Sequence, residues 1–234
     1  MKPVAIFRHF PTEGPGYFAT VLERHGVPWR LIKVDAGEAV PEDARQFAGL
    51  VFMGGPMSVN DDLPWIRPVL ELIRRAVDAE VPALGHCLGG QLMSAALGGV
   101  VSRNPVKEIG WGEVVVADTP LARQWFGDVQ SFVSFHWHGE TFTIPPGAER
   151  VLANRHCANQ AFALGKHLGM QCHVEMTADM IDAWCESGAR EIARSTSPAV
   201  QSIAAIKADL APRLAAMHRI ADGLYARWLR GLAE

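Results

Sequence analysis

The stretch from Val81 to Val100 constrains the fold more than any other part of this sequence. A short apolar run from Pro82 to Leu84 meets the segment Gly85-His86-Cys87-Leu88-Gly89, and a helix-like segment follows. A buried strand, a sharp turn with a nucleophile at its apex and a helix together form a nucleophile elbow. The pattern therefore predicts an α/β fold in which Cys87 occupies the apex of the turn.

The residues around Cys87 suit such a turn. An elbow holds its nucleophile in strained backbone geometry, and side chains at Gly85 and Gly89 would collide with the adjacent strand and helix. A helix that begins at Leu88 directs its positive end at the sulfur and favours the thiolate, the form that attacks a carbonyl carbon. A lone cysteine in apolar surroundings is more often an inert buried side chain. A catalytic role for Cys87 therefore depends on partners elsewhere in the chain.

Composition excludes several classes of protein. The 234 residues include 22 basic and 25 acidic side chains, with a net charge of -3 and no basic cluster, so we expect no nucleic-acid partner. The four cysteines are widely spaced, which argues against a zinc knuckle and fits reduced thiols in cytoplasm. No signal peptide is recognisable and no apolar run approaches membrane-spanning length. We expect a cytoplasmic protein that acts on a small molecule.

Predicted strands and helices alternate through the first part of the chain. The strands are Val4 to Arg8, Trp29 to Val34 and Gly49 to Met53, and the helices are Tyr17 to His25 and Trp65 to Ala79. This alternation is typical of a parallel sheet covered by helices, in which ligands bind beyond the carboxyl ends of the strands. Arg8-His9, Gly54-Gly55 and Cys87 should therefore share one edge of the sheet.

The loop Gly54-Gly55-Pro56 is a candidate oxyanion hole. With no side chain in the way, it can direct the Gly55 N–H at a developing oxyanion, and the Leu88 N–H would supply the second donor. The alternative is an ordinary turn at the end of a strand.

From Gly110 onward the pattern changes to short segments of alternating polarity. They are Trp111 to Ala117, Ser131 to Trp137, Val151 to Ala153, Gln160 to Leu164 and Leu168 to His173. Alternation of this kind predicts antiparallel strands that extend the sheet. His136 and His138 would share one strand face and could ligate a metal, but no further ligands are obviously paired with them. A substrate wall or a hydrogen-bonded packing role is favoured, and we predict no metal.

A base and an orienting carboxylate follow the last of these strands. A thiol nucleophile needs a histidine to accept and return a proton, and a carboxylate to fix the imidazole tautomer. His173 and Glu175 meet this description, because residues i and i+2 of an extended chain face the same way.

These residues resemble the class I glutamine amidotransferases, whose glutaminase domains use a Cys-His-Glu triad in this chain order. The resemblance covers roughly Val4 to Glu175, and the chain is most similar to stand-alone proteins related to the amidotransferase domain of GMP synthase. Three segments match the family: Gly54-Gly55-Pro56, Gly85-x-Cys87-Leu88-Gly89-x-Gln91 and Gly169-x-Gln171-x-His173-x-Glu175. Gly90, Cys172 and Val174 depart from its usual His, Phe and Pro.

The resemblance implies a three-layer α/β sandwich around a mostly parallel sheet with an antiparallel extension. It also implies a γ-glutamyl thioester on Cys87, with His173 and Glu175 completing the triad and no cofactor. By the same matching, the residues that bind the glutamine head group would be Gln91, Trp137, His138, Gly139 and Glu140.

The C-terminal segment carries an apolar stripe at spacings of three or four residues. Its members are Val200, Ile203, Ile206, Leu210, Leu214, Met217, Ile220, Leu224 and Trp228. We expect these side chains to pack on the protein's own sheet or on the helix from Asp179 to Trp184, and a kink or helix start near Pro212. A homodimer or partner surface is the alternative. The expected organisation is a catalytic core at residues 1–176 and a helical extension at 177–234 packed on the same domain.

The expected reaction is hydrolysis of the side-chain amide of glutamine, or of a related γ-glutamyl amide, to ammonia and glutamate. The ammonia could pass to an acceptor on a synthetase partner. Two alternatives remain: a glutaminase or regulatory subunit that depends on a separate synthetase, and a γ-glutamyl or other thiol peptidase. No Gly-x-x-x-x-Gly-Lys-Ser/Thr phosphate loop occurs in the chain.

Overall fold

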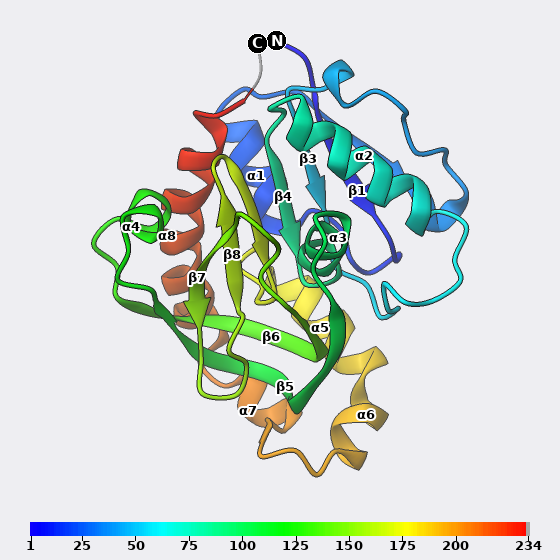
Figure 1. The fold of residues 1–234 in the computed structure, drawn as a ribbon. Coiled ribbons are helices and arrows are strands. Elements are labelled where there is room, and N and C mark those ends of the chain that lie inside the picture. The colour runs from blue at the N-terminus through cyan, green and yellow to red at the C-terminus, as the bar shows by residue number, and fades with distance from the viewer. Residues whose placement is uncertain (233–234) are drawn as a thin grey trace.

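The computed structural model describes residues 1–232, in which ten strands form one sheet with helices on both faces (Figure 1). The parallel half confirms the predicted alternation. Its strands, in spatial order, are β2 (Trp29–Lys33), β1 (Val4–Arg8), β3 (Gly49–Phe52), β4 (Ala83–His86) and β9 (His167–Met170). β4, which leads into Cys87, thus lies inside the sheet between β3 and β9.

The other half of the sheet is mostly antiparallel, as predicted. It contains β8 (Ala161–Leu164), β7 (Glu149–Ala153), β5 (Val101–Val116), β6 (Ser131–Phe142) and the short β10 (Ala199–Val200). β9 joins the halves, because it runs parallel to β4 and antiparallel to β8. The predicted strand from Leu168 to His173 is shorter in the structure, and its last residues leave the sheet and bring His173 beside Phe135.

β5 and β6 form a long hairpin that the sequence predicted only in part. β5 begins at Val101 rather than Trp111, and the pairing shifts register between Arg103 and Glu108. An irregularity of this kind interrupts the alternation of buried and exposed side chains. The alternation signal was therefore absent from the first half of the strand.

Helices cover the two faces of the sheet as separate layers (Figure 1). One apolar core holds residues of α1 (Gly16–Arg24), α5 (Ala178–Ser187) and α8 (Leu210–Leu229); the other holds residues of α2 (Ile66–Asp78) and α3 (Leu88–Ala96). The remaining helical segments are η1 (Val34–Ala36), η2 (Ala44–Gln46), α4 (Pro120–Phe126), α6 (Ala189–Arg194) and α7 (Ile203–Lys207). The result is the predicted three-layer α/β sandwich.

The C-terminal apolar stripe packs into this fold. Leu214, Met217, Leu224 and Trp228 of α8 are buried in the same core as α1. Pro212 is the third residue of α8, so it marks a helix start, which is one of the two outcomes expected for it. Val200 lies in β10 beside β5 instead of in a helix. Within residues 1–232, no helix combines the length and hydropathy needed to cross a membrane.

Candidate active site

β4, Cys87 and α3 form the strand, turn and helix that the sequence predicted. Cys87 has a φ of 51° and a ψ of −109°, which a side-chain-bearing residue rarely adopts. Backbone hydrogen bonds hold the turn on both sides: the Cys87 N–H donates to the Met170 carbonyl at 2.8 Å, and the Gln91 N–H donates to the Cys87 carbonyl at 3.0 Å. The strained turn is therefore fixed between β9 and the first turn of α3.

The glycines of the elbow have no room for a side chain. A Cβ at Gly85 would lie 2.5 Å from the backbone of Gly89, and a Cβ at Gly89 would lie 1.9 Å from the Phe52 carbonyl oxygen. A Cβ at Gly90 would lie 2.4 Å from the Met170 carbonyl oxygen. The glycine at position 90, a departure from the family pattern, is thus explained by the close approach of α3 to β9.

We predict that Gly89→Ala destabilises the protein by at least about 3 kcal/mol, the upper range for an overpacked core, because the added methyl meets main-chain atoms of β3. Urea unfolding would measure the change. Gly14→Ala is the matched control, since a Cβ there meets nothing within 4 Å, and it should stay within about 0.5 kcal/mol of wild type. Equal stabilities for the two variants would contradict the packing described for the elbow.

The predicted base and carboxylate lie together beneath the surface. His173 Nδ1 is 2.6 Å from Glu175 Oε1, and both residues are almost fully buried. Burial lowers the pKa of His173, but the Glu175 carboxylate and the neighbouring Cys87 thiol outweigh it, so this pKa lies well above its usual value. Burial raises the pKa of Glu175, whereas His86 and His173 lower it, to about 2. At neutral pH an imidazolium and a carboxylate therefore sit beside the Cys87 thiol.

Two polar groups contact the sulfur itself. Gln171 Nε2 lies 3.5 Å from Cys87 Sγ, and the Trp137 carbonyl oxygen lies 3.8 Å from it. The Gln171 amide oxygen accepts a hydrogen bond from Gln91 Nε2 at 3.1 Å. His173 Nε2 makes no hydrogen bond in the described part of the chain, so it is available to the thiol or a bound substrate.

The candidate oxyanion loop lies against the start of α3. A Cβ at Gly55 would be 2.8 Å from Leu88 Cδ2, which places the two predicted N–H donors on neighbouring segments. Leu88 is the first residue of α3, so its N–H has no acceptor within the helix. Burial lowers the pKa of His9 to about 4, and its neutral ring donates Nδ1–H to the Met53 carbonyl at 2.9 Å, which anchors the loop. Arg8 instead pairs with Asp35 at 2.8 Å.

The predicted head-group residues divide into two sets. Gln91 and the Trp137 carbonyl lie at the sulfur or one residue removed from it. The Trp137 indole points elsewhere and donates to Glu191, while Glu140 accepts a hydrogen bond from Ser58 at 3.1 Å. A Cβ at Gly139 would face Lys107, and the His138 ring pairs with Glu108. The structure therefore brings only part of this set to Cys87.

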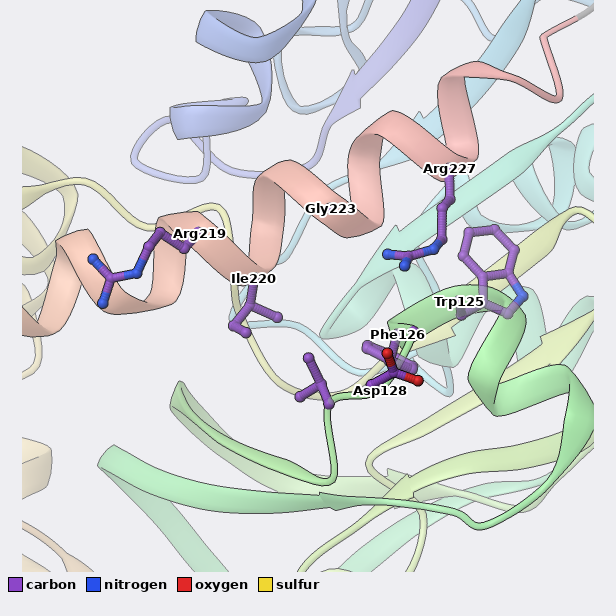
Figure 2. Close-up of a pocket in the computed structure, with 9 residues that line it drawn as sticks. Trp125, Phe126, Asp128, Arg219, Ile220, Gly223 and Arg227 are labelled. Atoms are coloured by element: carbon purple, nitrogen blue, oxygen red, sulfur yellow. The ribbon is translucent and has the colours of Figure 1, made fainter.

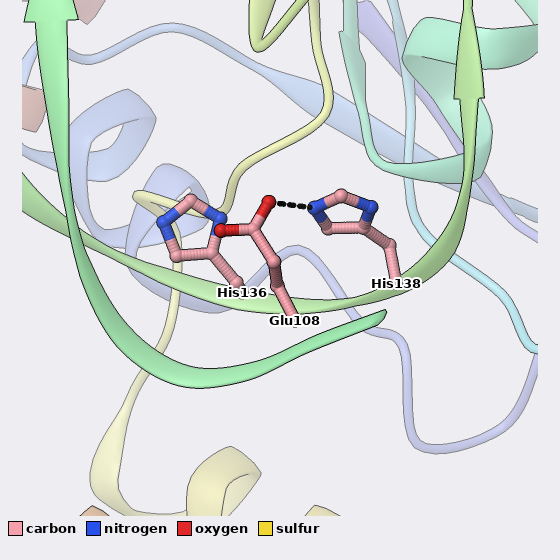
Figure 3. Close-up of side chains that lie close together, drawn as sticks. All are labelled: Glu108, His136 and His138. Atoms are coloured by element: carbon pink, nitrogen blue, oxygen red, sulfur yellow. Dashed lines mark ion pairs between the residues drawn. The ribbon is translucent and has the colours of Figure 1, made fainter. Parts of the chain in front are cut away.

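Glu108, His136 and His138 form a buried cluster whose ligand atoms lie within 4.8 Å of one another (Figure 3). The predicted shared face of the two histidines is confirmed. A carboxylate and two imidazoles could hold a metal ion, but the Glu108 oxygens already accept hydrogen bonds from Asn154 at 2.6 Å and Gln160 at 2.9 Å, and His138 Nε2 lies 3.0 Å away. The cluster is thus a hydrogen-bonded network that ties β5 to β6.

A separate hollow of about 530 Å³ lies between α4 and α8 (Figure 2). Trp125, Phe126 and Ile220 provide its apolar lining, and Arg219 and Arg227 stand at its sides. None of its lining residues belongs to the elbow or to the His173–Glu175 pair.

Sequence patterns missed Glu13, which the structure places in the site. A Cβ at Gly54 would lie 2.5 Å from Glu13 Oε2 and 3.4 Å from His173 Cε1, so the carboxyl group sits beside the oxyanion loop and the imidazole. Burial raises the pKa of Glu13 to about 8; the charge of His173 opposes the shift and that of Glu175 adds to it. Glu13 lies in an irregular loop, where no periodicity or motif marks it.

We predict that Glu13 makes the fold less stable as pH rises. Its pKa is about 8 in the folded protein and about 4.5 when unfolded, so between these values the folded state binds the extra proton and the free energy of unfolding falls. Because the residue is only half-buried, we expect about 1–2 kcal/mol. Glu13→Gln should lack this component in urea unfolding at pH 5 and pH 9. Parallel pH curves for wild type and variant would contradict the placement.

Comparisons with known proteins agree with this geometry. The family model described as glutamine amidotransferase class-I matches residues 18–183. A crystal structure of a glutamine amidotransferase from Methylobacillus flagellatus superposes with a TM-score of 0.98 at 44% identity, covering 100% of this chain and 96% of that one.

Curated relatives carry related names. The glutamine amidotransferase-like protein YfeJ of Salmonella typhimurium is 29% identical, over 86% of this chain and 87% of its own length. Gamma-glutamyl peptidase 3 of Arabidopsis thaliana is 25% identical, over 70% of this chain and 69% of its own. GMP synthase of Aeropyrum pernix is 30% identical over 72% of this chain, which spans 34% of that protein. The chain therefore belongs to the class I glutamine amidotransferases.

Proposed function

We propose that this protein hydrolyses the side-chain amide of glutamine, or of a related γ-glutamyl compound, through a thioester on Cys87. The observation that carries the proposal is the meeting of three segments at the carboxyl ends of β3, β4 and β9. The Gly54-Gly55 loop, the Cys87 elbow and the pair His173 and Glu175 supply an oxyanion hole, a nucleophile, a base and an orienting carboxylate.

In the first half of the reaction the Cys87 thiolate attacks the amide carbon. The N–H groups of Gly55 and Leu88 stabilise the negative oxygen that develops. When the carbon–nitrogen bond breaks, protonated His173 gives its proton to the departing nitrogen, and ammonia or an amine leaves. The γ-glutamyl group then remains attached to Cys87 as a thioester.

In the second half water attacks the thioester. Neutral His173 accepts a proton from the water, and the carbon–sulfur bond breaks to release glutamate and restore the thiolate. Glu175 stays ionised throughout, because its pKa of about 2 lies far below neutral pH, where the surrounding imidazoles offset its burial. It orients His173 and stabilises the charged imidazole.

A γ-glutamyl peptide is the second candidate substrate. The relative named gamma-glutamyl peptidase 3 supports it, since that protein aligns with most of this chain. Both substrates present the same γ-glutamyl carbonyl to Cys87 and differ only in the leaving group. The chemistry proposed for the chain is therefore the same in both cases.

The test is to incubate the purified protein with glutamine and with a panel of γ-glutamyl amides and peptides. Ammonia, glutamate and freed amine are measured separately. Ammonia and glutamate in equal amounts support the glutaminase, whereas freed amine from peptides without ammonia from glutamine supports the peptidase. Release of none of these products by the free protein, restored by a synthetase partner, would indicate a dependent subunit like those in two-part GMP synthases.

A further inference from the structure

The carboxylate of Glu175 has contacts beyond His173. Its Oε1 faces His173 Nδ1, while its Oε2 accepts a hydrogen bond from the Val174 N–H at 2.9 Å. The same Oε2 lies 3.1 Å from Nδ1 of His86, the residue just before the nucleophile. The ring nitrogen is close but not aligned well enough for a full hydrogen bond. All of these groups are buried away from water.

The opposite side of the His86 ring meets the C-terminal helix. Tyr225 of α8 places its hydroxyl 3.3 Å from His86 Nε2, and the two rings meet edge to face at 83°. Tyr225 is fully buried although it carries a polar hydroxyl. A buried hydroxyl needs a hydrogen-bond partner, and His86 is the partner that the structure gives it.

The protons of this row have one consistent arrangement. Burial lowers the pKa of His86, against the opposing charge of Glu175, and burial raises that of Tyr225 well above its usual value. His86 is therefore neutral and the phenol keeps its proton. The Tyr225 hydroxyl donates to Nε2, which leaves the single imidazole proton on Nδ1, facing Glu175.

We propose that His86 and Tyr225 are positioning residues that hold the Glu175 carboxylate in the orientation in which Oε1 engages His173. The inference rests on the proposed function of Cys87, His173 and Glu175. A carboxylate anchored at one oxygen can rotate, and a second polar contact on the other oxygen restricts that rotation. The C-terminal helix α8 thus supports the reacting groups as well as the core.

Three substitutions test the row by steady-state kinetics. His86→Leu removes the ring nitrogens, His86→Asn retains an N–H donor near the Nδ1 position, and Tyr225→Phe removes one oxygen. We expect His86→Leu to lower kcat about tenfold with KM within about twofold, and His86→Asn to recover most of the loss. Tyr225→Phe should lower kcat in the same way, whereas Tyr17→Phe, the matched control with a phenol bonded to Asp222, should not.

A proton NMR spectrum supplies a measurement that does not depend on turnover. The His173 Nδ1–H in its short contact with Glu175 should resonate far downfield of the amides and vanish in Glu175→Gln. We expect this signal to shift and exchange faster in His86→Leu and in Tyr225→Phe, and to be retained in His86→Asn. Should His86→Leu not fold, Tyr225→Phe carries the same test.

The outcomes separate the two proposals. Wild type that shows the downfield signal but turns over no γ-glutamyl compound overturns the proposed function, and the variant spectra still decide the role of His86. An unchanged signal in both His86→Leu and Tyr225→Phe overturns the positioning role. Wild-type kcat in both variants of an active enzyme overturns it as well.

Discussion

Replacing Cys87 by Ala or Ser abolishes release of ammonia from glutamine while the fold stays intact. The proposed reaction has no other route to the thioester, so kcat should fall by at least about 10³-fold, the scale seen when a nucleophile is removed from a triad. The fold should tolerate the change, because the sulfur makes only long contacts, at 3.5 Å to Gln171 and 3.8 Å to the Trp137 carbonyl. Ammonia release and the free energy of unfolding are the two measurements.

Cys185→Ala is the matched control for this experiment. Cys185 is buried on α5 and takes no part in the proposed chemistry, so its loss should affect stability slightly and turnover hardly at all. Unchanged ammonia release by Cys87→Ala, or an equal loss in both variants, would contradict the assignment of the nucleophile.

A chain that ends at Ser197 should fail to fold cooperatively. The truncation removes α8, whose Tyr225 and Trp228 are among the largest fully buried side chains. Trp228 packs where Gly49 of β3 has no side chain, since a Cβ there would lie 2.6 Å from the indole. We propose on this basis that the C-terminal helices form one domain with residues 1–176. Size-exclusion chromatography and urea unfolding of both lengths of chain test it.

A point substitution gives the same test within the full chain. Trp228→Ala should destabilise the protein by about 3–5 kcal/mol, as is usual for a large buried aromatic side chain. Arg219→Ala on the exposed face of α8 is its control and should change stability by less than about 0.5 kcal/mol. A truncated chain that stays folded and only changes its association would identify α8 as a docking surface instead.

The sequence predicted the elements whose signals are local. The elbow needs glycines at fixed positions around Cys87, and the backbone contacts of Gly85 and Gly89 explain why that signal was strong. The pairing of His173 with Glu175 was also predictable, because two residues of one extended segment meet without any long-range contact.

Contacts between distant segments were not predictable in this way. Glu13 reaches the site from an irregular loop, and Tyr225 reaches His86 across 139 residues. His138 was expected near the substrate, but its ring pairs with Glu108 on β5, which no local pattern could show. Each of these placements depends on how the sheet and α8 pack together.

Labelling by a glutamine-mimicking electrophile tests the central proposal most directly. A γ-glutamyl analogue that carries a reactive group at the amide carbon is incubated with the full chain, and peptide mass spectrometry locates the adduct. The account predicts a single adduct on Cys87 that glutamine protects against and that Cys87→Ala abolishes. An adduct on Cys157, Cys172 or Cys185 with Cys87 unmodified, in a protein that releases ammonia from glutamine, would contradict it.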